Sequence, residues 1–187
     1  YRLNIFGFFK HPEMQNQTGN FGLEDEILAL KWVKENIAQF GGDPENITLF
    51  GESAGGAHVS YHIASPLSKG LFNRGIIQSG GYNLSNSSRL NSMEDASKLA
   101  LKTQNTAGAM NLNELEQLSA NDLLTVSSSL YHPYHPIVDG ELIPDDITNI
   151  FIEGVLNDVD LMIGSNKNED LLYVDENPKL EDFSKLI

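Results

Sequence analysis

A serine lies between two glycines in the stretch Gly51-Glu52-Ser53-Ala54-Gly55, which fits the pattern G-x-S-x-G. Residues 47–50 before it are apolar or β-branched and predict a short buried strand, and residues 57–64 after it can form a helix. Strand, tight turn and helix form the context in which this pattern presents a nucleophilic serine. The predicted chemistry is attack of the Ser53 hydroxyl on a carbonyl carbon, with the Ala54 N–H as an oxyanion donor.

The glycines have a steric role in such a turn. A serine at so sharp a bend has a strained backbone conformation. We therefore expect that Gly51 and Gly55, two residues away on either side, have almost no room for a side chain.

A serine hydrolase also needs a base that accepts the hydroxyl proton and a carboxylate that orients the base. With the serine on a strand–helix turn, the chain order is serine, acid, histidine, and the acid follows a strand. Glu169 meets this condition, because it follows the predicted strand 161–164 and a short polar turn. Asp170 and Asp160 are alternatives, and Asp160 ranks lower because it lies inside or before that strand.

Two of the five histidines, His58 and His62, lie on the helix after Ser53. That helix leads away from the hydroxyl, so we expect these side chains in the core or in hydrogen bonds and not as the base. Their i, i+4 spacing suits zinc, but no glutamate adjoins the first histidine and no third ligand is apparent, so we reject a metal site.

The other histidines are no better as bases. His132 and His135 precede Glu169, against the expected order, and His11 is expected at the surface. No histidine follows His135, so the expected base is absent from this chain.

The elements that would position these residues alternate along the chain. This alternation predicts an α/β fold with parallel strands. Residues 83–130 are predicted to form a helical insertion or a cap over the sheet, and residues 11–22 a surface loop. The expected elements are strands at residues 1–9, 47–50, 74–78 and 159–164, helices at 23–40, 57–64, 93–103 and 112–124, and a turn-rich return to the core at 132–140.

Composition narrows the class of protein. The 12 Lys and Arg against 26 Asp and Glu give a net charge of −14, which disfavours nucleic acid as a partner. Without cysteine, the chain has no disulfide, thiol nucleophile or cysteine-ligated zinc. Four N-x-S/T sequons lie at Asn16, Asn83, Asn86 and Asn46. They mildly favour a secreted or endomembrane location over a cytoplasmic one. A glycan is not expected to fit at Asn46, which leads directly into the predicted strand.

Further motifs extend over most of the chain. They include Gly19-Asn20-x-Gly22-Leu23-x-Asp25, Phe40-Gly41-Gly42-Asp43-Pro44, Gln78-Ser79-Gly80 and Pro136-x-Val138-Asp139-Gly140. Together with the serine turn, they make the sequence resemble the type-B carboxylesterase and cholinesterase family of α/β-hydrolases. The resemblance implies a mostly parallel central sheet with helices on both faces, of which residues 1–187 would be the incomplete central portion of one domain.

The resemblance also implies a role for each matching residue. Ser53 matches the nucleophile, the Ala54 N–H part of the oxyanion hole, and Glu169 the acid of a Ser-Glu-His triad. Glu52 resembles an acidic neighbour of the nucleophile, and Ser79 a hydroxyl close to the triad. The triad histidine and the glycine-rich half of the oxyanion hole are expected outside residues 1–187, so these residues alone are expected to be inactive.

The implied function is hydrolysis of a small carboxylic ester through an acyl-enzyme, with no cofactor and no metal. The alternative is a non-catalytic, cholinesterase-like adhesion or binding protein, because the family includes such homologues. Two departures concern the site: Asp170 stands where many members have glycine after the acid, and residues 82–86 lack the Pro-Trp pair found beside small acyl pockets.

Overall fold

The structure, a computed structural model, describes residues 1–80, 90–130 and 134–169. Several predictions from the sequence concern residues outside these ranges. They are the sequons at Asn83 and Asn86, the acyl-pocket residues 82–86, His132 and the alternative acid Asp170.

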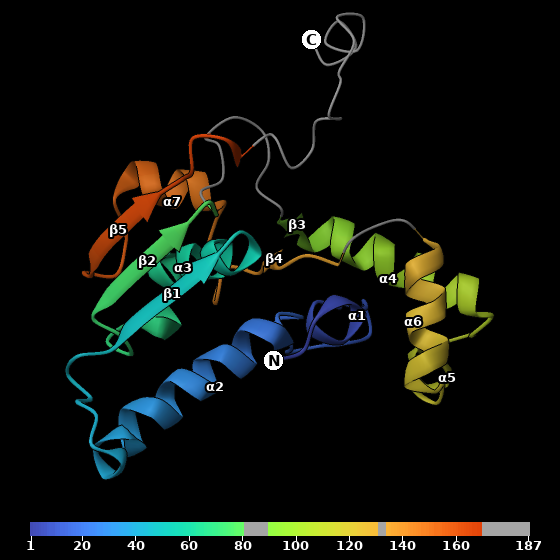
Figure 1. Cartoon of the computed structure of the whole chain (residues 1–187). Coiled ribbons are helices and arrows are strands. Elements are labelled where there is room, and N and C mark those ends of the chain that lie inside the picture. The colour runs from blue at the N-terminus through green and yellow to red at the C-terminus, as the bar shows by residue number, and fades with distance from the viewer. Residues whose placement is uncertain (81–89, 131–133, 170–187) are drawn as a thin grey trace, which may run out of the picture.

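A three-stranded parallel sheet organises the fold. Its strands are β1 (Thr48–Glu52), β2 (Arg74–Gln78) and β5 (Asp160–Gly164), in the order β1-β2-β5 (Figure 1). The predicted parallel pairing is confirmed, and the strand at 74–78 has the predicted limits. Because all three strands run the same way, their carboxyl ends meet at one edge of the sheet.

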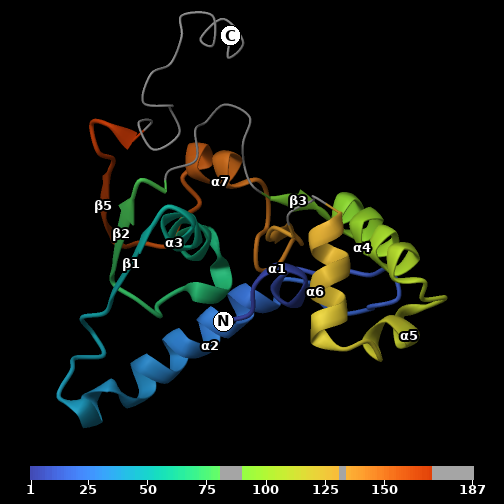
Figure 2. The same ribbon diagram turned by 45° about the vertical axis from the view of Figure 1, so that its right-hand side comes forward.

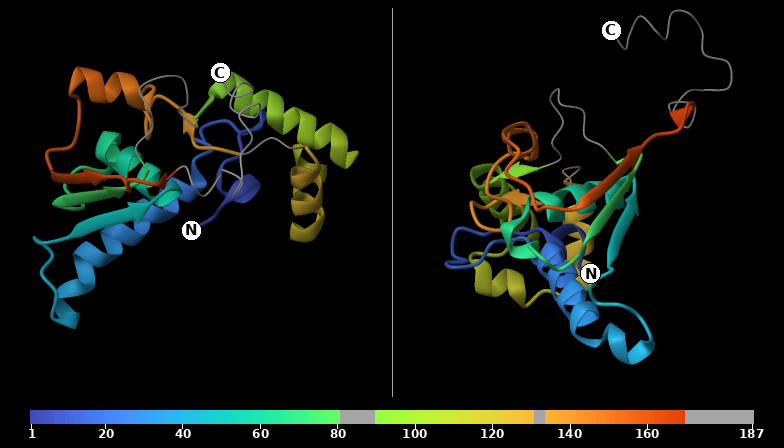
Figure 3. Two further views of the ribbon diagram at one scale, coloured as in Figure 1. Left: turned by 45° about the horizontal axis from the view of Figure 1, so that its top comes forward. Right: turned by 90° about the vertical axis from the view of Figure 1, so that its left-hand side faces the viewer.

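Helix α3 (Ala54–Ala64) covers one face of this sheet. Gly75 and Ile77 of β2 face it, since a Cβ on Gly75 would contact Ile63 and Val59 of that helix. On the opposite face, Phe50 and Met162 are 71% and 66% exposed. The described residues thus supply helices for one face only (Figure 3).

The predicted helix at 23–40 is confirmed, with a tighter last turn. Helix α2 spans Phe21–Asn36 and continues as the 3-10 helix η1 (Ile37–Phe40). Gly41 then adopts a left-handed conformation, φ 82°, which ends the helix. Leu23 and Ile27 are buried on the face that packs into the core.

The strand predicted at residues 1–9 is wrong. This segment contains helix α1 (Asn4–Gly7), a single turn in which the N–H groups of Phe6 and Gly7 donate to the Leu3 carbonyl at 3.2 and 3.1 Å. Ile5 and Phe8 are its buried large side chains, and their spacing of three is helical and not alternating. A short apolar run does not by itself distinguish the two structures.

The surface loop predicted at residues 11–22 is wrong at two positions. His11 is buried, and its Nε2 lies 2.7 Å from Oε1 of Gln104 in helix α4 (Met93–Ala107). Asn20 is also buried, and its side chain bonds both the N–H and the carbonyl of Ile137 in strand β4 (Ile137–Val138). Both polar side chains are buried because a distant segment satisfies their hydrogen bonds.

Three helices follow strand β3 (Asn91–Ser92): α4 (Met93–Ala107), α5 (Leu112–Glu116) and α6 (Ala120–Ser129). The helix predicted at 112–124 is two helices, because the Ser119 hydroxyl caps a new N-terminus by accepting from the Asp122 N–H at 3.2 Å. These helices lie beside α1 and away from the three-stranded sheet (Figures 1 and 2). An insertion over residues 83–130 stays a prediction.

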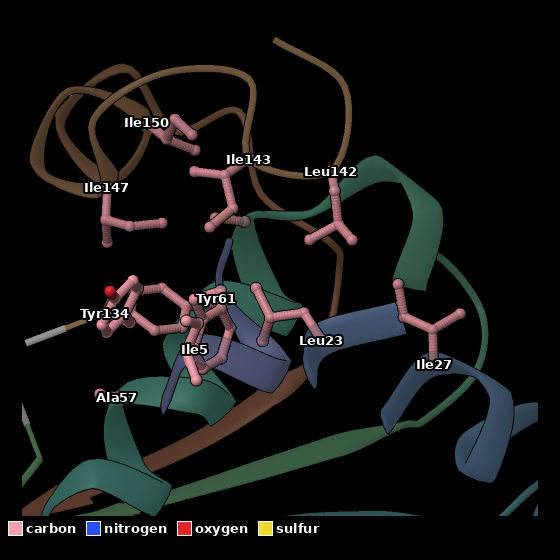
Figure 4. Close-up of a cluster of buried hydrophobic side chains, with 12 residues drawn as sticks. Ile5, Leu23, Ile27, Ala57, Tyr61, Tyr134, Leu142, Ile143, Ile147 and Ile150 are labelled. Atoms are coloured by element: carbon pink, nitrogen blue, oxygen red, sulfur yellow. The ribbon is translucent and has the colours of Figure 1, made fainter. Parts of the chain in front are cut away.

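Helix α7 (Ile147–Glu153) has no counterpart among the predicted elements. Asp146 caps it by accepting from the Thr148 N–H at 2.8 Å, and Gly154 ends it with φ 71°. Ile147 and Ile150 enter the main hydrophobic core, which Figure 4 shows. This core joins α1, α2, α3 and α7, so α3 is packed against several elements at once. Its members are Ile5, Phe8, Leu23, Ile27, Ala57, Tyr61, Ala64, Tyr134, Leu142, Ile143, Ile147 and Ile150.

Candidate active site

Ser53 lies between the last residue of β1 and the first residue of α3, with φ 52° and ψ −115°. The predicted strand–turn–helix context is therefore confirmed, but the expectation that the strand is buried is wrong, since no residue of β1 is buried and Phe50 is 71% exposed. A non-glycine residue in such a conformation costs roughly 1–3 kcal/mol, and the surrounding structure must hold it there. The Ser53 N–H donates to the Gln78 carbonyl at 2.9 Å, and the Ser53 carbonyl accepts from the Ala57 N–H at 3.1 Å.

Ala54 is the first residue of α3. N–H groups in the first turn of a helix have no acceptor within that helix, and the helix dipole places partial positive charge there. The Ala54 N–H is therefore suited to bind an oxyanion beside the Ser53 hydroxyl.

Close backbone packing explains some of the glycines around the turn. A Cβ on Gly51 would overlap the carbonyl of Gly55. A Cβ on Gly80 would come within 2.5 Å of both Gly56 Cα and the Ser53 carbonyl oxygen. The expectation for Gly55 is wrong, because a Cβ there would meet no described atom within 4 Å outside the backbone of its own helix.

We expect Gly80→Ala to destabilise the protein by about 1–3 kcal/mol, because the new methyl group pushes the turn after β2 away from Ser53. The measurement is the midpoint of thermal unfolding of the full-length protein. Gly55→Ala is the matched control and is expected to leave the midpoint unchanged or raise it, since alanine favours a helix. Equal midpoints for Gly80→Ala and wild type would contradict the close packing.

Glu169 is fixed by two hydrogen bonds in the loop after β5. The Ser79 hydroxyl donates to its Oε1, and the Asn166 N–H donates to the same oxygen at 2.6 Å. The bond from Ser79, followed by that from Asn166, lowers the pKa of Glu169 below its usual range. Of the two carboxylate oxygens, Oε2 accepts neither bond and is suited to bind a further donor.

Backbone hydrogen bonds continue past the ends of the strands and align the three turns. The Ser53 N–H reaches the Gln78 carbonyl in β2, and the Ser79 N–H reaches the Gly164 carbonyl in β5 at 2.8 Å. The structure therefore brings the Ser53 turn, Ser79 and Glu169 to the same edge of the sheet, where the parallel strands end.

Two other acidic residues lie near these strands. Asp160 is the first residue of β5, at the opposite edge of the sheet, and its carboxylate lies 3.5 Å from the Arg74 guanidinium. Its position disfavours it as the triad acid. Glu52 ends β1 and is exposed, and its role beside the nucleophile stays a prediction.

The prediction that His58 and His62 form hydrogen bonds is confirmed. Both bind the carboxylate of Glu26 in α2, at 2.9 Å from His58 Nδ1 and 2.9 Å from His62 Nε2. The sequence alone did not indicate their partner, because Glu26 lies 32 residues before His58. Among the described residues, no cluster of His, Asp and Glu has an arrangement that could hold a metal ion.

Sequence reasoning missed the two backbone groups that align the site, the Gln78 carbonyl and the Asn166 N–H, because backbone groups leave no signal in residue types. The position of Glu26, in contrast, did leave a signal in the sequence. Glu26 lies within the apolar stripe of α2, next to Ile27 and three residues from Leu23, where a carboxylate needs a buried partner.

Comparison with known proteins identifies the family of the chain. Residues 1–185 match the model of the carboxylesterase family. The chain is 38% identical over 186 residues to bile salt-activated lipase from Bos taurus, covering 93% of this chain and 31% of the relative. It is 38% identical over 189 residues to neuroligin-2 from Homo sapiens, covering 97% of this chain and 22% of the relative.

Among solved structures, a carboxylesterase from Geobacillus stearothermophilus superposes with a TM-score of 0.80 and 38% identity, over 92% of this chain and 37% of that one. The fold is therefore that of an α/β-hydrolase, of which the chain spans about a third in these enzymes. Matched in this way over nearly its whole length, the chain belongs to the carboxylesterase family.

Proposed function

We propose that the protein is a serine carboxylester hydrolase, with Ser53 as nucleophile and Glu169 as the triad acid. The observation that carries this proposal is the strained Ser53 turn at the end of β1. Beside it, at the ends of β2 and β5, the Ser79 hydroxyl donates a hydrogen bond to Glu169. The resemblance to esterases supports the reaction class.

In the proposed reaction, Ser53 Oγ bonds to the ester carbonyl carbon while its proton passes to a histidine that is not among residues 1–187. The carbonyl oxygen becomes an oxyanion, which the Ala54 N–H stabilises together with donors outside these residues. The carbon–oxygen bond to the alcohol then breaks, and the histidine returns the proton to the leaving alcohol. Water repeats the sequence on the acyl-enzyme and releases the acid.

Glu169 acts on the histidine in this proposal. Its carboxylate stays ionised because the hydrogen bonds from Ser79 and Asn166 lower its pKa. An ionised carboxylate at this edge accepts the imidazole N–H and stabilises the imidazolium that forms during attack. No cofactor and no metal takes part in this chemistry.

The second candidate is a non-catalytic binding protein, favoured by the similarity to neuroligin-2. In that case the Ser53 turn would persist as part of the fold without an activated hydroxyl. The two candidates differ in the reactivity of one oxygen atom, so they can be separated chemically.

A fluorophosphonate probe tests the proposal. The full-length protein is treated with the probe at neutral pH, digested, and the labelled peptide is located by mass. Label on Ser53, absent after heat denaturation, is expected for the hydrolase. A folded protein that takes up no label would establish that Ser53 is not activated and would favour the binding protein.

We also propose that the protein matures in the secretory pathway. Of the two sequons within the described residues, Asn16 lies exposed in a turn with φ 61°, where a glycan can extend into solvent. Asn46 is exposed as well, but its side-chain oxygen accepts from Arg74. We expect that peptide-N-glycosidase lowers the mass of the protein and that Asn16→Gln abolishes this change in mass. An unglycosylated Asn16 peptide from the secreted protein would contradict glycosylation at this site. No helix among the described residues is long and apolar enough to cross a bilayer.

A further inference from the structure

A carboxylate in α2 binds two histidines of α3, the helix that begins directly after Ser53. Glu26 accepts from His58 Nδ1 at 2.9 Å through both oxygens and from His62 Nε2 at 2.9 Å through Oε2. His62 Nδ1 in turn lies 2.8 Å from Ser68 Oγ. We call Glu26, His58, His62 and Ser68 the Glu26 cluster.

The Glu26 cluster is largely withdrawn from solvent. The side chains of Glu26, His58 and His62 are 15%, 13% and 2% exposed. Burial acts to raise the pKa of Glu26, but the hydrogen bonds from the two histidines outweigh burial and the net pKa is lowered. The carboxylate therefore remains ionised at neutral pH, and each histidine bond is charge-assisted.

Other titratable groups face the cluster from neighbouring elements. The Tyr1 ring packs against His58 at a tilt of 42° with ring centroids 5.4 Å apart, and the ring of Tyr61, in α3 itself, lies 5.5 Å from that of His58. Asp25, the neighbouring acid in α2, is paired with Arg2 at 2.7 Å and not with a histidine. Glu26 is thus the carboxylate that holds the His58 and His62 rings.

The spacing along α3 connects the cluster with the nucleophile. Ala54, His58 and His62 follow one another at intervals of four residues and share one face of the helix, so that successive members lie about one turn, or ~6 Å, apart along the axis. Glu26 therefore contacts α3 one turn after Ala54, whose N–H would bind the oxyanion.

The strained Ser53 turn needs support on more than one side. On the sheet side, it is held by the Gln78 carbonyl and by the close approach of Gly80. On the α2 side, the hydrogen bonds from His58 and His62 to Glu26 supply polar contacts to α3. A strained conformation persists only while such contacts determine the position of the helix.

We propose that Glu26 is a positioning residue for the esterase reaction: by holding His58 and His62, it sets the position of the first turn of α3 and thereby of Ser53 and the Ala54 N–H. This role rests on the proposed function, because it takes Ser53 as the nucleophile. Glu26 itself does not touch the substrate.

Glu26→Gln is the informative substitution. Glutamine keeps the size of the side chain but has one acceptor oxygen and an NH₂ group, which cannot accept from a histidine N–H. At least one histidine then loses its acceptor and α3 shifts. Glu35→Gln, on the exposed side of the same helix, removes the same charge without touching α3 and is the matched control.

The experiment measures kcat and KM for a p-nitrophenyl ester, the rate of fluorophosphonate labelling of Ser53, and the thermal midpoint, on full-length variants at pH 7 and 25 °C. For Glu26→Gln we expect kcat and the labelling rate to fall about 10- to 100-fold with KM changed less than about threefold, because small displacements of reacting groups act on the transition state. Glu35→Gln is expected to match wild type within about twofold.

A purely structural role would give another result. If Glu26→Gln lowers the thermal midpoint but is labelled at the wild-type rate while folded, the positioning role is overturned. If Glu26→Gln does not fold, His58→Phe replaces it, because phenylalanine retains ring packing against Tyr1 and leaves the Glu26–His62 bond in place. We expect that variant to lose about three- to tenfold in kcat, and an unchanged kcat would overturn the proposal. Absence of label on wild type would instead overturn the proposed function itself.

Discussion

Ser53→Ala is expected to lower kcat for a p-nitrophenyl ester by about 10⁴- to 10⁶-fold in the full-length protein. The substitution removes Oγ, the only atom that bonds to the substrate in the proposed reaction. The residual rate comes from substrate binding and the oxyanion donors, which the substitution leaves in place. Fluorophosphonate labelling of the peptide that contains residue 53 is expected to disappear together with turnover.

The fold of this variant is expected to survive, which makes the loss of activity interpretable. Alanine has the same Cβ as serine, so the strain at φ 52° does not change. The side chain is exposed, so its removal opens no cavity. Ser129→Ala, at the exposed end of α6, is the matched control and is expected to keep wild-type kinetics. Turnover by Ser53→Ala above about 1% of wild type would refute Ser53 as the nucleophile.

Glu169→Gln is expected to lower kcat by about 10³- to 10⁴-fold with little change in KM. A glutamine can still accept from Ser79 and Asn166 through its one oxygen, so the loop keeps its conformation. Its NH₂ group then takes the place of Oε2, and it neither orients the histidine N–H nor stabilises an imidazolium. The effect is therefore on the chemical step and not on substrate binding.

Steady-state kinetics and single-turnover labelling of Ser53 measure this prediction. Glu153→Gln, an exposed glutamate at the end of α7, removes the same charge far from the site and is expected to match wild type within about twofold. A Glu169→Gln variant with more than a third of wild-type kcat would show that another carboxylate orients the base. Asp170, the next residue along the chain, would then be the first to replace.

Local patterns in the sequence were sufficient for the elements around the nucleophile. The apolar run before Gly51, the glycine pattern and the following helix predicted β1, the Ser53 turn and α3. The run Arg74–Gln78 predicted a strand with its observed limits, and the apolar stripe of α2 predicted that helix. Such predictions succeed because the deciding interactions lie within a few residues along the chain.

The errors concern segments whose conformation depends on distant partners. Residues 1–9 are apolar enough for a strand, but their core contacts require the helical turn of α1. His11 and Asn20 are polar and read as a surface loop, yet Gln104 and Ile137 satisfy them more than 90 residues away. Helix α7 was missed because it is short and its apolar residues pack into a core that forms only in the folded chain.

The sequence by itself determined the candidate nucleophile, the candidate acid and the parallel strands that carry them, because the glycine pattern of the turn and the alternation of strands and helices are set by local residue types. Only the tertiary structure decided which oxygen of Glu169 is occupied, which edge Asp160 lies on, and that Glu26 binds both histidines of α3. These are contacts between residues 32 to 90 positions apart in the sequence. Hydrogen bonds at such separations depend on how helices and strands pack, and no local pattern of residue types specifies them.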